Sequence, residues 1–223
     1  MDEPTFHDLL RRGAQYEASD ALFKVGQPPA FRVRGSLHYL RGDKLHPDHT
    51  RILAQLVLKQ SRYAGNIDEL KEYDTSYGVP GVGRYRVSVY RQRGTLALAM
   101  RSIPLEIPSF EQLKVTPVAG NFAELERGMV LVVGAAGNGK SSTLAAIIGH
   151  LNRTKRLHII TIEDPIEFLH TDALATVSQR EIGLDTPDFA TALRAALRQD
   201  PDVILVGEIR DEETMDIALK AAE

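Results

Sequence analysis

The chain has 223 residues, of which 43% are hydrophobic and 26% charged, so it is long enough to bury one large core or two small ones. It contains no cysteine, which excludes a disulfide framework, a cysteine metal site and a thiol nucleophile and suits a reducing cytosol. No apolar run approaches the roughly 18 residues that cross a bilayer, and the acidic start MDEPTFHDLL is unlike a signal peptide, so we expect a cytoplasmic protein.

The net charge of −3 is unevenly divided along the chain. Residues 1–117 hold 17 lysine and arginine residues against 13 acidic ones, whereas residues 118–223 hold 10 against 17. The two parts therefore carry +4 and −7, which favours docking of one on the other within a chain or between copies. Ordinary scatter of solvated surface charge explains these counts equally well.

The first half alternates short apolar runs with turn residues. Residues 21–40 contain two strand-like pieces around Gly26–Pro29, and residues 83–103 contain two more around Arg93–Gly94. Residues 49–60 between them have helical apolar spacing. We predict a small α+β domain at residues 1–101 and, because three prolines follow in IPLEIPSFEQLKVTP, a linker at 102–117.

The second half has longer apolar runs, MVLVV, LHIITI and VILVG, separated by segments of helix length. This pattern is typical of a parallel sheet that is buried on both faces, with helices as crossover connections. We expect Thr186 to cap a helix that begins at Pro187, and Asp211 to cap the last helix. Residues 118–223 therefore predict an α/β core.

A glycine-rich loop follows the first of these runs and precedes a helix. Its sequence fits the phosphate-loop pattern G-x-x-x-x-G-K-[ST], in which glycines let backbone N–H groups and the helix N-terminus converge on phosphate oxygens. We expect Lys140 to contact the β- and γ-phosphates, Ser141 to bind Mg²⁺ and Ser142 to lie at the α-phosphate. The expected nucleotide-binding residues of the loop are Gly134, Gly137, Asn138, Gly139, Lys140, Ser141 and Ser142. The alternative is a glycine-rich turn with a surface lysine.

Acidic residues follow the other two apolar runs. Glu163 and Asp164 end the run LHIITI, and Glu208 follows VILVG. Ligands of open α/β sheets bind outside the carboxyl ends of the strands, so acids placed there point toward the phosphate loop and its metal. The alternative is that these acids cap helices or solvate loops.

The second-half motifs resemble those of the type II/type IV secretion ATPase superfamily. GAAGNGKSSTLAAII is similar to its phosphate loop, ITIEDPIEFLH to its acidic box, and the segment from VSQREIGLD to DEETMDIALKAAE to its atypical Walker B region. In the first half, ASDALFKVGQPPAFRVRG and GRYRVSVYRQRG resemble the twitching-motility retraction ATPases of the superfamily.

This resemblance implies a P-loop NTPase of the α/β class, with a PAS-like N-terminal domain at 1–101 and a RecA-like ATPase core at 118–223 that is incomplete at its C-terminus. It further implies ATP and Mg²⁺ as cofactors, a homo-oligomer that is a hexameric ring, and ATP-driven pilus disassembly. The partner it implies is a pilus platform protein of the inner membrane, with the ATPase peripheral to that membrane.

The resemblance also implies roles for single residues. Glu163 and Glu208 are the expected catalytic residues, Glu163 as the base that orients or deprotonates water and Glu208 on the Mg²⁺ side, although the residue pattern alone leaves their order open. Nucleotide contacts are expected from Arg86, Arg93 and Arg101, for which a solvated basic face is the alternative. Arg194 and Arg198 share a helix face and could sense phosphate or pair with carboxylates.

Three other functions stay open on the sequence. One is an accessory or divergent ATPase of the same superfamily, and another is a module that binds nucleotide without hydrolysing it. The third is a RecA-like nucleic-acid motor, which the acidic, aromatic-poor second half disfavours, so we expect no nucleic-acid partner. Because the last apolar helix pattern, EETMDIALKAAE, stops without a terminating residue, we also expect the chain to be a fragment.

Overall fold

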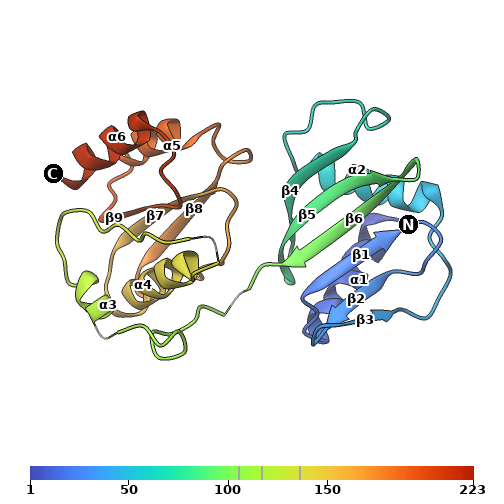
Figure 1. The fold of residues 1–223 in the computed structure, drawn as a ribbon, viewed down its shortest axis with the longest axis horizontal. Coiled ribbons are helices and arrows are strands. Elements are labelled where there is room, and N and C mark those ends of the chain that lie inside the picture. The colour runs from blue at the N-terminus through green and yellow to red at the C-terminus, as the bar shows by residue number, and fades with distance from the viewer. Residues whose placement is uncertain (105, 117, 136) are drawn as a thin grey trace. The chain divides into compact units, whose positions relative to one another are not determined.

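The computed structural model describes residues 1–104, 106–116, 118–135 and 137–223, with the side chains of residues 118 and 119 left out. The chain is a mixed α/β protein that divides into two compact units, Met1–Ile103 and Pro104–Glu223 (Figure 1). Each unit has its own sheet. Within the described residues, no helix is both long and apolar enough to cross a membrane.

The first unit is built on a six-stranded antiparallel sheet with strand order β3-β2-β1-β6-β5-β4. Its elements in chain order are α1 (Glu3–Gln15), β1 (Asp20–Lys24), β2 (Ala30–Val33), β3 (Ser36–Tyr39), α2 (Pro47–Lys59), β4 (Glu72–Val79), β5 (Gly83–Gln92) and β6 (Thr95–Ser102). The expected strands around Gly26–Pro29 and around Arg93–Gly94, and the helix between them, are confirmed. Helix α1 and strand β4 were not indicated by the sequence pattern.

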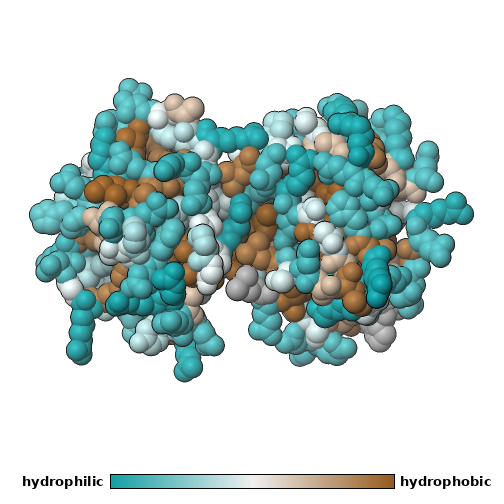
Figure 2. Space-filling model, turned by 180° about the vertical axis from the view of Figure 1, so that it is seen from behind, coloured by the Kyte–Doolittle hydropathy of each residue, from teal (hydrophilic) through white to brown (hydrophobic). Residues whose placement is uncertain are grey.

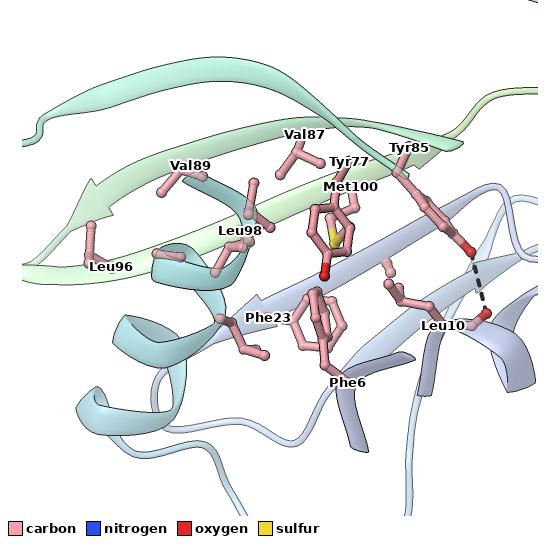
Figure 3. Packing of buried hydrophobic residues seen from close by; sticks show 14 of the residues in the cluster. Phe6, Leu10, Phe23, Tyr77, Tyr85, Val87, Val89, Leu96, Leu98 and Met100 are labelled. Atoms are coloured by element: carbon pink, nitrogen blue, oxygen red, sulfur yellow. Dashed lines mark hydrogen bonds between the residues drawn. The ribbon is translucent and has the colours of Figure 1, made fainter. Parts of the chain in front are cut away.

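One core fills the space between this sheet and its two helices. Phe6 of α1 is fully buried. Its ring packs edge-on against Phe23 of β1, with ring centroids 5.4 Å apart. The same ring packs in a tilted arrangement against Tyr77 of β4, with ring centroids 5.6 Å apart. Figure 3 shows these rings together beneath the strands, and the Tyr85 hydroxyl donating to the carbonyl of Leu10 at 3.3 Å. The helices are therefore held to one face of the sheet, and the other face is left for polar side chains.

The second unit has a three-stranded parallel sheet with strand order β8-β7-β9. Its elements are α3 (Val118–Phe122), α4 (Lys140–Thr154), β7 (His158–Glu163), β8 (Thr176–Glu181), α5 (Phe189–Ala196), β9 (Val203–Val206) and α6 (Glu212–Ala222). The predicted parallel arrangement of LHIITI and VILVG is confirmed, because Ile162 pairs with Val206.

Helices cover both faces of this sheet. Ile159 packs with Ile148 and Leu151 of α4 on one face, whereas Ile160 and Ile162 pack with α5 and α6 on the other. Figure 1 shows α4 on one side of the sheet and α5 with α6 on the opposite side. This alternation explains why isoleucines occupy consecutive positions in the run, and it turns Thr161 and Glu163 to the α4 side.

Part of the segment expected to be a linker packs on the second unit. Ile107 lies so close to Gly149 of α4 that a Cβ at this glycine would be 2.7 Å from the Ile107 side chain. The Phe110 and His150 rings are 5.5 Å apart. The unit boundary accordingly falls between Ile103 and Pro104, two residues beyond the predicted end of the first domain.

Two local predictions in the second half are wrong. Residues 129–133 (MVLVV) form no strand, and the Val133 side chain is 88% exposed, because this apolar segment has no strand beside it with which to pair among the described residues. The cap of α5 is Asp188, whose carboxylate accepts from the Thr191 N–H, and not Thr186 two residues earlier. Figure 2 shows several patches of exposed apolar side chains among hydrophilic ones on this side of each unit.

Candidate active site

Two glycines of the glycine-rich loop before α4 have a left-handed backbone. Gly137 and Gly139 each have φ near 80°, in the left-handed region where a side chain is strained, so these positions require glycine. The Lys140 ammonium donates to the Ala135 carbonyl at 2.9 Å, which folds the lysine back over the loop. Ala136 lies outside the described residues.

The N-terminus of α4 differs from those of α1, α5 and α6. Each of those three helices begins with an aspartate whose carboxylate accepts from a backbone N–H of the first turn, at Asp2, Asp188 and Asp211, as predicted for Asp211. The cap of α4 is Gly139, which has no side chain to accept a hydrogen bond, and the first turn has no acidic residue. The positive end of this helix dipole is therefore available to an anion.

The packing of α4 sets this N-terminus near the carboxyl ends of the strands. Near the end of α4, the Asn152 carbonyl accepts from Leu174 and Ala175, which immediately precede β8, so the C-terminus of the helix lies at the amino edge of the sheet. The helix has 15 residues and spans about 22 Å, whereas the six residues of β7 span about 20 Å. Since α4 runs antiparallel to β7, its first turn reaches the opposite edge, where β7 ends.

Glu163 is the last residue of β7 and is held by three donors. Its Oε1 accepts from the Thr161 hydroxyl at 2.6 Å and from the Gln179 amide at 3.1 Å, and its Oε2 accepts from the Glu167 N–H at 3.4 Å. Burial raises the pKa of Glu163 above its ordinary value, and the hydrogen bonds from Thr161 and Gln179 oppose this rise without cancelling it. A carboxylate with a raised pKa is a better proton acceptor, which is what a general base requires.

Glu208 lies at the end of the neighbouring strand. Gly207 donates its N–H to the Ile162 carbonyl at 2.8 Å, and a Cβ at this glycine would be 3.2 Å from the same oxygen, so a side chain here would push the two backbones a few tenths of an ångström apart. The following Glu208 carboxylate is partly exposed and lies 2.5 Å from the Arg210 guanidinium. Parallel pairing thus places Glu163 and Glu208 at the same edge of the sheet.

A metal at this edge would need ligands from outside the protein. The described residues include no group of three or more histidine, aspartate or glutamate side chains that could hold a metal ion by themselves. Mg²⁺ ordinarily binds one or two protein oxygens together with phosphates and water, and Ser141 and Glu208 are residues of the right chemistry for that role.

The three arginines expected to contact nucleotide lie on the first unit, and the structure brings two of them together. Arg86 of β5 pairs in register with Arg101 of β6, and Arg101 donates to Asp20 at 3.0 Å. Both arginines are exposed on the polar face of the sheet. Arg93 instead occupies the β5–β6 turn with φ 48°, seven residues and about 23 Å along the strand from Arg86. These three nucleotide contacts stay predictions.

Arg194 of α5 and Arg198, which lies in the turn after α5 and not on the helix as expected, have local partners. Arg194 forms an ion pair with Glu213 of α6, and Arg198 donates to the Arg194 carbonyl at 2.9 Å. Pairing with a carboxylate is therefore the observed arrangement for Arg194.

Two residues that contact Glu163, Thr161 and Gln179, were not predicted from the sequence. Thr161 shares a strand face with Glu163 by the period of two, so this contact could have been found from the sequence. Gln179 is on β8, and its contact with Glu163 depends on the pairing of two strands that are 12 residues apart in the chain, which no local pattern reveals.

Comparison with known proteins now defines the class. Residues 98–223 match the family described as type II/IV secretion system protein, and the chain therefore belongs to this family. The type IV pilus retraction ATPase PilT of Pseudomonas aeruginosa is 42% identical over 217 residues, covering 97% of this chain and 62% of PilT. The type IV pilus ATPase PilU of the same organism is 40% identical over 218 residues, covering 98% of this chain and 57% of PilU. The chain thus spans about three fifths of the length of these relatives.

Solved structures of ATPases also match this chain. The crystal structure of the pilus retraction motor PilT with bound ADP matches with a TM-score of 0.84 and 42% identity, covering 97% of this chain and 63% of PilT. The structure of the ATPase DotB of Legionella pneumophila matches with a TM-score of 0.80 and 33% identity, covering 98% of this chain and 63% of DotB.

The surroundings of His170 predict a pH dependence of stability. Burial, and secondarily the charge of Arg153 on α4, lower the pKa of His170 from 6.5 to about 4. The folded protein therefore holds a neutral imidazole that the unfolded chain would protonate, so the stability due to this group is complete above pH 6.5 and is lost as the pH falls toward about 4. NMR titration of the imidazole C–H signal, assigned from its loss in His170→Gln, is expected to give a midpoint near 4. A midpoint at the ordinary value of 6.5 would contradict the assigned environment.

Proposed function

We propose that this chain is the nucleotide-binding and hydrolysing part of the ATP-driven motor of a type IV pilus machine, which powers pilus retraction and twitching motility. The observation that carries the proposal is the joint arrangement of α4 and the strand ends. A helix N-terminus without a capping acid reaches the sheet edge at which Glu163 and Glu208 end two adjacent parallel strands. Membership in the family and the 42% identity to PilT support the same conclusion.

In this proposal the second unit supplies the chemistry. The loop residues Gly134, Gly137, Asn138 and Gly139 surround the phosphates with backbone N–H groups, Lys140 neutralises the β- and γ-phosphates, and Ser142 lies at the α-phosphate. Ser141 and Glu208 would hold Mg²⁺, which would supply positive charge against the phosphate oxygens. Glu163 orients the attacking water and accepts its proton, a role that its raised pKa supports.

The larger assembly is part of the same proposal. Residues 1–101 form a PAS-like domain, 102–117 a linker and 118–223 the RecA-like ATPase core. The protein works as a hexameric ring in the cytoplasm at the inner-membrane base of the pilus machine, peripheral to the membrane and bound to a platform protein. Arg86, Arg93 and Arg101 meet nucleotide at a domain or subunit interface, and nucleic acid is not a partner.

A second candidate is the function of an accessory pilus ATPase. The observation that favours it is the 40% identity to PilU, which is nearly equal to the 42% identity to PilT. Both candidates use the same ATP site and differ in the cellular role of the motor.

The Lys140→Ala variant is expected to bind ATP about 10- to 100-fold more weakly, because a hydrogen bond to a charged group contributes about 1.5–3 kcal/mol. Isothermal titration calorimetry measures the affinity. Lys220→Ala is the matched control, because Lys220 is an exposed lysine of the same unit that pairs with Asp216 on α6. Unchanged affinity in Lys140→Ala would remove the phosphate-loop assignment.

The Glu163→Gln variant is expected to hydrolyse ATP about 100-fold more slowly while it still binds ATP, because the carboxamide cannot accept the proton from water. Steady-state phosphate release and nucleotide binding are measured on the same preparation. Glu126→Gln, which changes an exposed glutamate of the same unit, is expected to keep the parental rate. Near-parental turnover in Glu163→Gln would exclude Glu163 as the base.

A further inference from the structure

The side-chain amide of Gln179 connects Glu163 to the loop that follows it. Its Nε2 donates to Glu163 Oε1 at 3.1 Å and to the Phe168 carbonyl at 2.9 Å. Its Oε1 accepts from the His170 N–H at 2.8 Å. One side chain of β8 therefore contacts both the end of β7 and two positions of the 164–170 loop.

The chemistry of these partners permits only one orientation of the amide. Glu163 Oε1 and the Phe168 carbonyl are acceptors, whereas the His170 N–H is a donor. A flipped amide would direct its oxygen at a carboxylate and a carbonyl and would lose all three hydrogen bonds. The Gln179 side chain is half-buried, so water replaces these partners poorly.

The hydrogen bonds divide the two oxygens of Glu163 into different roles. Oε1 has two donors, the Thr161 hydroxyl at 2.6 Å and the Gln179 amide at 3.1 Å, whereas Oε2 has only the longer contact of 3.4 Å to the Glu167 N–H among the hydrogen bonds described. Oε1 is therefore the anchored oxygen, and Oε2 is the oxygen with capacity to accept a proton.

Other groups around Glu163 do not duplicate this anchoring. Glu181, which lies beside Glu163 in register on β8, accepts through its Oε2 from the Ile166 N–H at 3.1 Å. Just after β9, Gly207 has no side chain, and Glu208 is paired with Arg210. The negative charge of Glu167 raises the pKa of Glu163 and so opposes ionisation.

We propose that Gln179 is a positioning residue for ATP hydrolysis: its amide fixes Glu163 Oε1 relative to the 164–170 loop, so that Oε2 is presented to the attacking water. This inference rests on the proposed role of Glu163 as the base. Gln179 itself contacts neither water nor nucleotide in this role. Removing the Gln179 amide is therefore expected to lower the rate of ATP hydrolysis and to leave nucleotide binding intact.

The first test compares the rate with the Michaelis constant in the full-length protein. Gln179→Leu keeps the approximate size of the side chain and removes all three hydrogen bonds. It is expected to lower kcat about 10- to 100-fold, the usual effect of misplacing a catalytic group by about 1 Å, while KM for ATP changes less than about threefold. Gln199→Leu, at an exposed glutamine of the same unit, is expected to keep both constants. A raised KM with unchanged kcat in Gln179→Leu would overturn the inference.

A double-mutant cycle shows whether Gln179 acts through Glu163. In a Glu163→Ala background, Gln179→Leu is expected to change the residual turnover less than about twofold, because the group that it positions is already absent. A further 10- to 100-fold fall in that background would overturn the inference while leaving the role of Glu163 intact. Parental turnover in Glu163→Ala alone would instead contradict the proposed function.

A second variant separates positioning from folding. Gln179→Glu keeps an oxygen for the His170 N–H and replaces the donor to Glu163 with a second carboxylate, so it is expected to lower kcat at least as much as Gln179→Leu. A melting temperature close to that of the parent shows that this variant is folded. A folded Gln179→Glu protein with parental kcat would overturn the inference.

Discussion

The parallel pairing of β7 with β8 and β9 is the constraint on which the candidate site depends. It places Ile162 beside Val206 and Glu163 beside Glu181, so that the polar residues after each strand meet at one edge. A slip of β7 by one residue would turn Thr161 and Glu163 into the apolar cluster beneath α5 and α6 and would expel Ile160 and Ile162 from it. Burial of these two isoleucines therefore fixes the position of the candidate base.

The two halves of helix α4 have different roles: the second half packs on the sheet, and the first turn is the proposed phosphate-binding end. Ile148 and Leu151 in its second half are buried against β7, and this packing sets the direction and depth of the helix. Its first turn has no capping acid, and the glycines before it adopt a backbone that other residues adopt only with strain. The apolar contact thus holds an electropositive helix end at the edge where the acids lie, which is the combination that anion binding requires.

The sequence predicted the parts of the site that depend on local pattern. The apolar runs at 157–162 and 203–206 identified two parallel strands with acids after them, and the glycine pattern identified the loop before α4. Residues 129–133 were wrongly predicted as a strand, because an apolar run favours a strand but does not show that a neighbouring strand is present to pair with it. Gln179 shows the same limit, since its contact with Glu163 arises only from the register between β7 and β8. Arg93 occupies the turn that the pattern indicated at Arg93–Gly94, because a two-residue hairpin needs positive φ there.

We propose that the N-terminus of α4 and the ends of β7 and β9 form one site for ATP and Mg²⁺. The most direct measurement is a crystal structure of the full-length protein with a non-hydrolysable ATP analogue and Mg²⁺. Phosphate oxygens are expected within hydrogen-bonding distance of the Lys140 and Ser141 N–H groups, with the metal near Ser141 and Glu208. Glu163 Oε2 is expected to face a water at the γ-phosphate. Phosphates bound away from the first turn of α4, or a Glu163 carboxylate turned away from the γ-phosphate, would contradict the proposed site.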